Sequence, residues 1–146
     1  MSRPTVEQIV ALERAALDRW GAGDPGGFLE GYAADVTYFD PVTPARIDGH
    51  AAMADYYRPW FGKIRVDRYE ILHPTLVATD DLAVLTYNLV NFLRTDDGGE
   101  RVLNRWNSTT VYQRREGAWT IAHSHWSFTQ PALATPASAA DTSLMA

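Results

Sequence analysis

The stretch LAVLTYNLVNFLRTDDGGERVLNRWNSTTVYQRREGAWTIAHSHWSF, residues 82–128, decides the fold. It is rich in β-branched and aromatic residues, which favour strands, and two short interruptions divide it into three runs. The interruptions, DDGG at 96–99 and EG at 116–117, have the composition of hairpin turns. A similar run ends at Asp80-Asp81, just before the stretch. We therefore predict four successive antiparallel strands, over residues 67–79, 82–94, 101–114 and 119–128.

The sequence before these strands has apolar residues at helical spacing. Thr5 and Gln8 form a capping box, and the apolar repeat that follows stops at a glycine-rich turn. Asp24-Pro25 repeats the start signal of a helix, an N-cap residue followed by proline. A β-rich run then ends at Asp40, and Pro59 bends or ends a later helical run. The predicted elements are helices over residues 6–20, 28–33 and 50–61 and a strand over 36–39.

Helices followed by strands is the order of an α+β domain. We expect three N-terminal helices packed on a mainly antiparallel sheet, in one domain over residues 1–130, because a chain of 146 residues fits a single core. The remaining residues, 131–146, are rich in alanine, serine and proline and show no periodicity. For them we expect a disordered tail.

Composition excludes several classes of protein. The formal net charge is −5, and the chain has a single lysine, so no basic stripe is available for nucleic acid. The absence of cysteine excludes disulfides, thiolate metal sites and a cysteine nucleophile. No run of eighteen apolar residues occurs, and the start MSRPTVEQ lacks the apolar segment of a secretory signal. We expect a cytoplasmic protein that does not contact a membrane.

The predicted strand over residues 82–94 is apolar on both of its faces in the segment AVLTYNLV. Helices on one side of a sheet cover only one face, so the other face needs a partner. A homodimer formed through the outer face of the sheet is the simplest partner. Cover by the chain's own loops would give the same pattern.

Three short segments and their spacing carry a family resemblance. They are Ala22-Gly23-Asp24, Ala34-Asp35-Val36-Thr37 and Asp40-Pro41-Val42, followed by Gly49. This region resembles ketosteroid isomerase and the wider SnoaL-like (polyketide-cyclase) branch of the nuclear transport factor 2 superfamily. The resemblance implies a cone-shaped α+β barrel with a curved sheet and a pocket that works without a cofactor. It places Asp40 where the isomerase keeps its general base.

The last predicted hairpin, residues 110–127, carries a second resemblance. Its sequence, TVYQRREGAWTIAHSHWS, is similar to the association (hub) domain of calcium/calmodulin-dependent kinase II, another branch of the same fold. That resemblance implies an alternative to an enzyme, namely a non-catalytic module that binds a ligand or forms oligomers.

Asp40 is the leading candidate catalytic residue. A carboxylate between aromatic neighbours at the mouth of a dry pocket becomes more basic and could move a proton next to a carbonyl group. The alternative is a turn aspartate whose side chain accepts backbone N–H groups. His125 is the second candidate, and it shares one face of its strand with His123. As a metal site this pair would need a third ligand from Asp40, His50 or His73, and we expect no metal.

Large aromatic residues supply the candidate binding surface. They could fill a core or line a cavity for a small apolar or aromatic ligand. The candidate ligand-binding residues are Trp20, Tyr32, Tyr38, Tyr56, Trp60, Tyr87, Asn91, Trp106 and Trp126. Together these features predict a protein with a small-molecule-binding pocket. The resemblance to ketosteroid isomerase and the polyketide-cyclase branch implies a cofactor-independent isomerase, cyclase or dehydratase acting on an apolar carbonyl compound, with Asp40 as the base. Amides and hydroxyls that could stabilise the oxyanion are those of Asn91, Asn104, Asn107 and Ser108.

Overall fold

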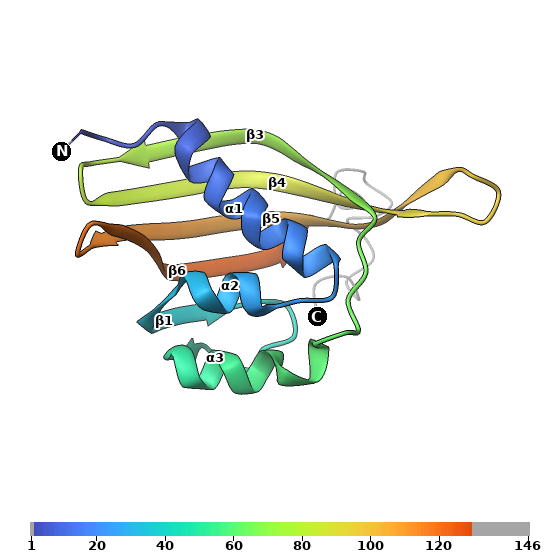
Figure 1. Ribbon diagram of the computed structural model, residues 1–146, viewed down its shortest axis with the longest axis horizontal. Coiled ribbons are helices and arrows are strands. Elements are labelled where there is room, and N and C mark those ends of the chain that lie inside the picture. The colour runs from blue at the N-terminus through green and yellow to red at the C-terminus, as the bar shows by residue number, and fades with distance from the viewer. Residues whose placement is uncertain (1, 130–146) are drawn as a thin grey trace, which may run out of the picture.

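Helices cover one face of a six-stranded sheet in the computed structural model, which describes residues 2–129 (Figure 1). The α+β class and the three helices are confirmed. The helices are α1 (Val6–Gly21), α2 (Gly26–Gly31) and α3 (His50–Tyr57), followed by a short 3-10 helix η1 (Arg58–Trp60). The strands are β1 (Tyr32–Phe39), β2 (Ile47–Asp48), β3 (Arg68–Ala78), β4 (Leu82–Arg94), β5 (Glu100–Arg115) and β6 (Ala118–Phe128). The predicted tail, residues 131–146, lies outside the described residues.

The four predicted strands form the antiparallel meander β3-β4-β5-β6, and their ends fall within one residue of the predicted positions. The whole sheet has the order β2-β1-β6-β5-β4-β3. Strand β1 pairs in parallel with β6, far away in the sequence, so local pattern gives no sign of the pairing. The two-residue strand β2 was also not predicted. The hairpin of β4 and β5 extends beyond the rest of the sheet (Figure 1).

Helix α1 begins at the predicted capping box. Thr5 Oγ1 accepts a hydrogen bond from the Gln8 backbone N at 3.1 Å, and the Thr5 backbone N donates to Gln8 Oε1 at 2.8 Å. The buried stripe of the helix packs on the sheet through Ile9, Ala16 and Leu17. Among residues 2–129, no helix has the length and apolar character needed to cross a membrane.

Two helix ends differ from the prediction. Helix α2 ends at Gly31, and the predicted last helical residues Tyr32 and Ala33 are instead the first residues of β1, where both are buried and Tyr32 lies opposite Ile121. Helix α3 ends at Tyr57 rather than at residue 61. The chain continues as η1 because Pro59 has no N–H with which to extend the α-helical ladder.

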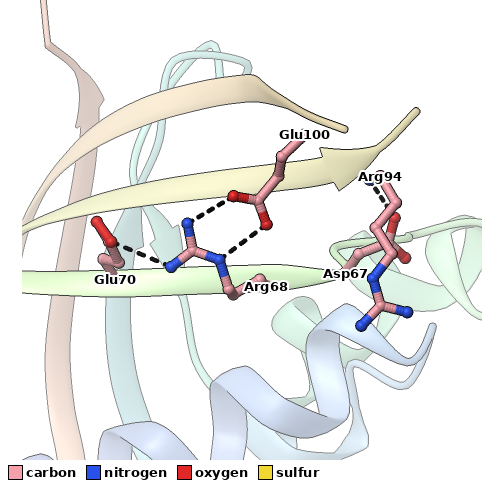
Figure 2. A network of polar contacts seen from close by, with 5 residues as sticks. All are labelled: Asp67, Arg68, Glu70, Arg94 and Glu100. Carbon is pink, nitrogen blue, oxygen red and sulfur yellow. Dashed lines mark hydrogen bonds and ion pairs between the residues drawn. The ribbon is translucent and has the colours of Figure 1, made fainter. Parts of the chain in front are cut away.

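Alternate residues of the sheet face the helices or the opposite, outer side. On the outer side of β3 to β5, the Arg68 guanidinium donates to Glu100 at 2.7 and 2.8 Å and to Glu70 at 3.1 Å (Figure 2). Its carbon Cζ lies 4.1 Å from the centroid of the Phe92 ring. At the same end of the sheet, Asp67 accepts from the Arg94 backbone N at 2.7 Å. The chain's own ion pairs therefore cover part of the apolar outer side of β4.

Candidate functional site

A cavity of about 480 Å³ lies between the helices and the inner face of the sheet. Its walls are largely aromatic and aliphatic. Seven of the nine predicted ligand-binding residues line it: Trp20, Tyr38, Tyr56, Trp60, Asn91, Trp106 and Trp126. The aromatic residues therefore line a cavity instead of filling the core completely.

Edge-to-face ring contacts fix the cavity walls. The Trp106 and Trp126 rings lie 5.9 Å apart at an interplanar angle of 86°, and Trp126 meets Phe28 at 6.4 Å and 88°. Trp20 contacts Tyr57 at 5.3 Å. Rings held in this way keep their orientation, because each edge lies against the electron-rich face of a neighbour.

Asp40 sits at the cavity with all of its acceptor positions engaged. Its Oδ2 accepts from the Tyr56 hydroxyl at 2.6 Å and from the Tyr38 hydroxyl at 2.9 Å. Its Oδ1 accepts from the backbone N of Val42 at 2.8 Å and of Thr43 at 3.1 Å. Asp40 thus lines the cavity and also accepts the backbone N–H groups of its own turn, as the turn interpretation predicted.

The two tyrosines bound to Asp40 act as hydrogen-bond donors. Burial raises the pKa of Tyr38 well above its ordinary value. Burial, and then the hydrogen bond to Asp40, raises the pKa of Tyr56. Both phenols therefore stay protonated at neutral pH, and each presents an O–H group to the carboxylate.

Amide groups add further polar atoms to the cavity wall. Asn91 on β4 and Asn104 on β5 both line the cavity, and Asn91 Nδ2 donates to Asn104 Oδ1 at 2.9 Å. Asn107 faces the outer side of the sheet, where its Oδ1 accepts from Asn88 Nδ2 at 2.7 Å. Ser108 is buried beside Tyr87, away from the cavity.

The structure does not bring His125 to Asp40. His125 lies on the outer side of the sheet, opposite Thr109 on β5, and its ring is 5.2 Å from that of Phe39. It borders a separate polar groove that also includes His73. His123 lies on the same outer side, with Nδ1 2.7 Å from Thr37 Oγ1, and burial lowers the pKa of its imidazole.

Two of the predicted ligand-binding tyrosines are core residues instead. The Tyr32 hydroxyl lies 2.9 Å from the Tyr57 hydroxyl, and Tyr87 donates to the carboxylate of Glu13. Metal binding also finds no support in residues 2–129, where no group of three His, Cys, Asp or Glu side chains could hold an ion.

Glu13 is a buried acid that was not predicted from the sequence. It accepts from the Tyr112 hydroxyl at 2.6 Å as well as from Tyr87, and only 1% of the residue is exposed. Burial raises the pKa of its carboxyl. A signal existed in the sequence, since Glu13 stands four residues after Ile9 and four before Leu17, in the middle of the buried stripe of α1.

The comparison with known families agrees with this fold. The family model of the SnoaL-like domain matches residues 14–135. The chain belongs to the SnoaL-like domain family. Among curated proteins, none matches this SnoaL-like chain.

Solved structures similar to this SnoaL-like domain come from several branches of the fold. A provisionally assigned ketosteroid isomerase from Parabacteroides distasonis is 31% identical, with a TM-score of 0.74 over 88% of this chain and 90% of that one. An NTF2-like protein of unknown function from Pseudomonas putida is 23% identical (TM-score 0.69, 83% and 84%). The association domain of calcium/calmodulin-dependent kinase II from C. elegans is 20% identical (TM-score 0.69, 84% and 94%). The last two share the fold alone.

Proposed function

We propose that this SnoaL-like domain binds a small, largely apolar carbonyl compound in the aromatic cavity, and that Asp40 transfers a proton on it without a cofactor. One observation carries the proposal: Asp40 is the only carboxylate among the described residues that line the cavity. The similarity to a provisionally assigned ketosteroid isomerase supports the same class of reaction. A mostly apolar cavity with a few converging polar groups is the usual form of a small-molecule site.

The proposed chemistry begins with an exchange of hydrogen bonds. The Tyr56 hydroxyl stops donating to Asp40 and donates to the substrate carbonyl oxygen instead. A lone pair of Asp40 Oδ2 then becomes available to accept a proton. Tyr56 is the better donor to exchange because it is half-buried, whereas Tyr38 is only 4% exposed. Substrate binding itself would then activate the base. Tyr56 would stay in place as a donor to the oxygen where negative charge develops.

The proton on the α-carbon of the substrate then moves to Asp40. The bond between hydrogen and the α-carbon breaks, its electron pair moves to the carbonyl oxygen as an enolate, and the proton forms an O–H bond with Asp40. Returning that proton to a different carbon completes an isomerisation. Giving it to a departing hydroxyl group completes a dehydration, and giving it to the oxygen of a second carbonyl attacked by the enolate completes a cyclisation.

Exchange of the α-protons of 2-tetralone in D₂O, followed by proton NMR, tests this function. We expect the wild-type protein to speed exchange over buffer, and Asp40→Asn to lower the protein-dependent rate by about a hundredfold while 2-tetralone still binds. Asp55→Asn is the matched control, because Asp55 is an exposed acid beside Tyr56 that does not line the cavity. Equal rates for wild type and Asp40→Asn would reject Asp40 as the base.

A second candidate function is ligand binding without catalysis. The observation that favours it is the full set of four hydrogen bonds on Asp40, two of them from the backbone of its own turn. A carboxylate held in this way stabilises a loop even if it never accepts a proton. The NMR experiment separates the two functions, since a binding protein would bind 2-tetralone and leave its exchange at the buffer rate.

We further propose that the domain forms a homodimer through the outer side of the sheet. The side chains of Val77 and Val84, which face each other across β3 and β4, belong to this side, and Val77 is 72% exposed. Sedimentation at micromolar concentration is expected to give about twice the 16.3 kDa of one chain. Val77→Glu should raise the monomer fraction. A wild-type protein that sediments only as a 16.3 kDa species would exclude the dimer.

A further inference from the structure

The mouth of the cavity carries the only lysine of the chain, Lys63. Its side chain is exposed and lines the cavity together with that of Arg65. Arg65 is already paired with Asp67, through contacts of 3.0 and 2.6 Å. Lys63 makes no ion pair or side-chain hydrogen bond with any residue from 2 to 129. It is thus the cation of the cavity lining that stays available to a ligand.

The backbone that carries Lys63 is held firmly. The segment 61–67, which joins η1 to β3, runs along the corner where α1 meets α2 (Figure 1). The Gly62 backbone N donates to the Gly23 carbonyl at 2.8 Å, and the Val66 backbone N donates to the Gly21 carbonyl at 3.0 Å. These two hydrogen bonds, one on each side of Lys63, fix the position of the backbone that carries its side chain.

The charges of the cavity set the orientation of a charged ligand. The carboxylate of Asp40 repels an anionic group, and the amides of Asn91 and Asn104 carry no charge that could attract one. Aromatic walls give an apolar body a place to lie, but they do not solvate a charge. An anionic group would therefore be placed at the mouth, where Lys63 can pair with it and water can still reach it.

We infer that the cavity takes an amphiphilic anion, with its apolar body between the tryptophan rings and a carboxylate, sulfonate or phosphate group at Lys63. The inference rests on the proposed function, because it names the class of ligand that the same cavity binds. The carbonyl group of such a ligand lies in the apolar body, on the side of Asp40. Lys63 is then a specificity residue that selects anions over neutral compounds of the same shape.

Two fluorescent probes of nearly the same shape test this inference. 8-Anilinonaphthalene-1-sulfonate carries one negative charge, and N-phenyl-1-naphthylamine carries none. We expect both probes to bind the wild-type protein and to displace each other, which shows that they share one cavity. Lys63→Met should raise the dissociation constant of the sulfonate by about threefold to tenfold and change that of the neutral probe by less than about twofold.

Conservative and distant variants complete the design. Lys63→Arg should keep the preference for the sulfonate, and added salt should weaken the sulfonate more in the wild type than in Lys63→Met. Arg105→Met is the matched control, because Arg105 is exposed on the outer side of β5 and does not line the cavity.

The outcomes separate the two proposals. An unchanged sulfonate affinity in Lys63→Met, or an equal loss for both probes, overturns the role of Lys63 and leaves the cavity as a ligand site. Failure of the wild-type protein to bind either probe overturns the proposed ligand site and this inference with it.

Discussion

Glu13→Ala is expected to lower the free energy of unfolding by about 3–5 kcal/mol, the largest loss for any single substitution proposed for this domain. The change removes the acceptor of two buried hydroxyls, those of Tyr87 and Tyr112, and leaves a cavity beneath α1. Each unsatisfied buried hydroxyl costs about 1–3 kcal/mol, and the cavity adds to this cost. Denaturation by urea, followed by circular dichroism at pH 7, measures the loss.

Glu13→Gln is the matched control because it keeps the shape of the side chain and removes its charge. Burial raises the folded-state pKa of Glu13 above the ordinary 4.5. The stability that comes from this shift is fully present below pH 4.5 and is lost as the pH rises through the folded-state value. We therefore expect Glu13→Gln to equal or exceed the wild type at pH 8, and its relative gain to shrink as the pH falls towards 5.

The hydroxyl of Thr110 offers a hydrogen-bond acceptor to a neutral Glu13. Thr110 Oγ1 is buried near the carboxyl, and it makes no hydrogen bond with any residue from 2 to 129. It can accept the proton of the neutral acid, while Tyr87 and Tyr112 continue to donate. If Glu13→Gln were as unstable as Glu13→Ala, the core would require an ionised carboxylate, and this account of Glu13 would be wrong.

The strands could be predicted from sequence because their signals are local. Strand β4 begins at Leu82 and ends at Arg94, as the turn residues on both sides indicate. Asp40 could be placed at the end of β1 for the same reason, since Pro41 stops regular pairing. The position of β1 in the sheet could not be predicted, because its parallel partner β6 follows about eighty residues later.

The face occupied by His125 depends on one extra residue in β6. The pairs are Val111 with His123 and Tyr112 with Ile121, so Ala122 is a bulge. Ile121 is in the core, and without the bulge strict alternation would direct His123 and His125 to the same inner face. The bulge moves both histidines to the outer side. Nothing in the local sequence indicates an insertion of this kind, so the candidate site could not be completed from sequence alone.

Gly21→Ala is expected to lower the free energy of unfolding by about 1–3 kcal/mol, although the same change usually stabilises a helix by about 0.5–1 kcal/mol. The reason is the close approach of the segment that carries Lys63. A Cβ atom on Gly21 would lie 2.8 Å from the Val66 carbonyl oxygen and 3.3 Å from Val66 Cβ. The backbone of residues 61–67 would have to move away from α1, so we also expect both fluorescent probes to bind more weakly.

Gly31→Ala separates this packing effect from helix propensity. Gly31 is also the last residue of a helix, but a Cβ atom there would meet only the flexible end of Ile121, at 3.6 Å. Its substitution should therefore leave stability unchanged or raise it by up to about 1 kcal/mol. Thermal and urea denaturation of both variants measure whether each substitution raises or lowers the free energy of unfolding. A Gly21→Ala protein as stable as Gly31→Ala, with unchanged probe binding, would show that the mouth of the cavity does not depend on this contact.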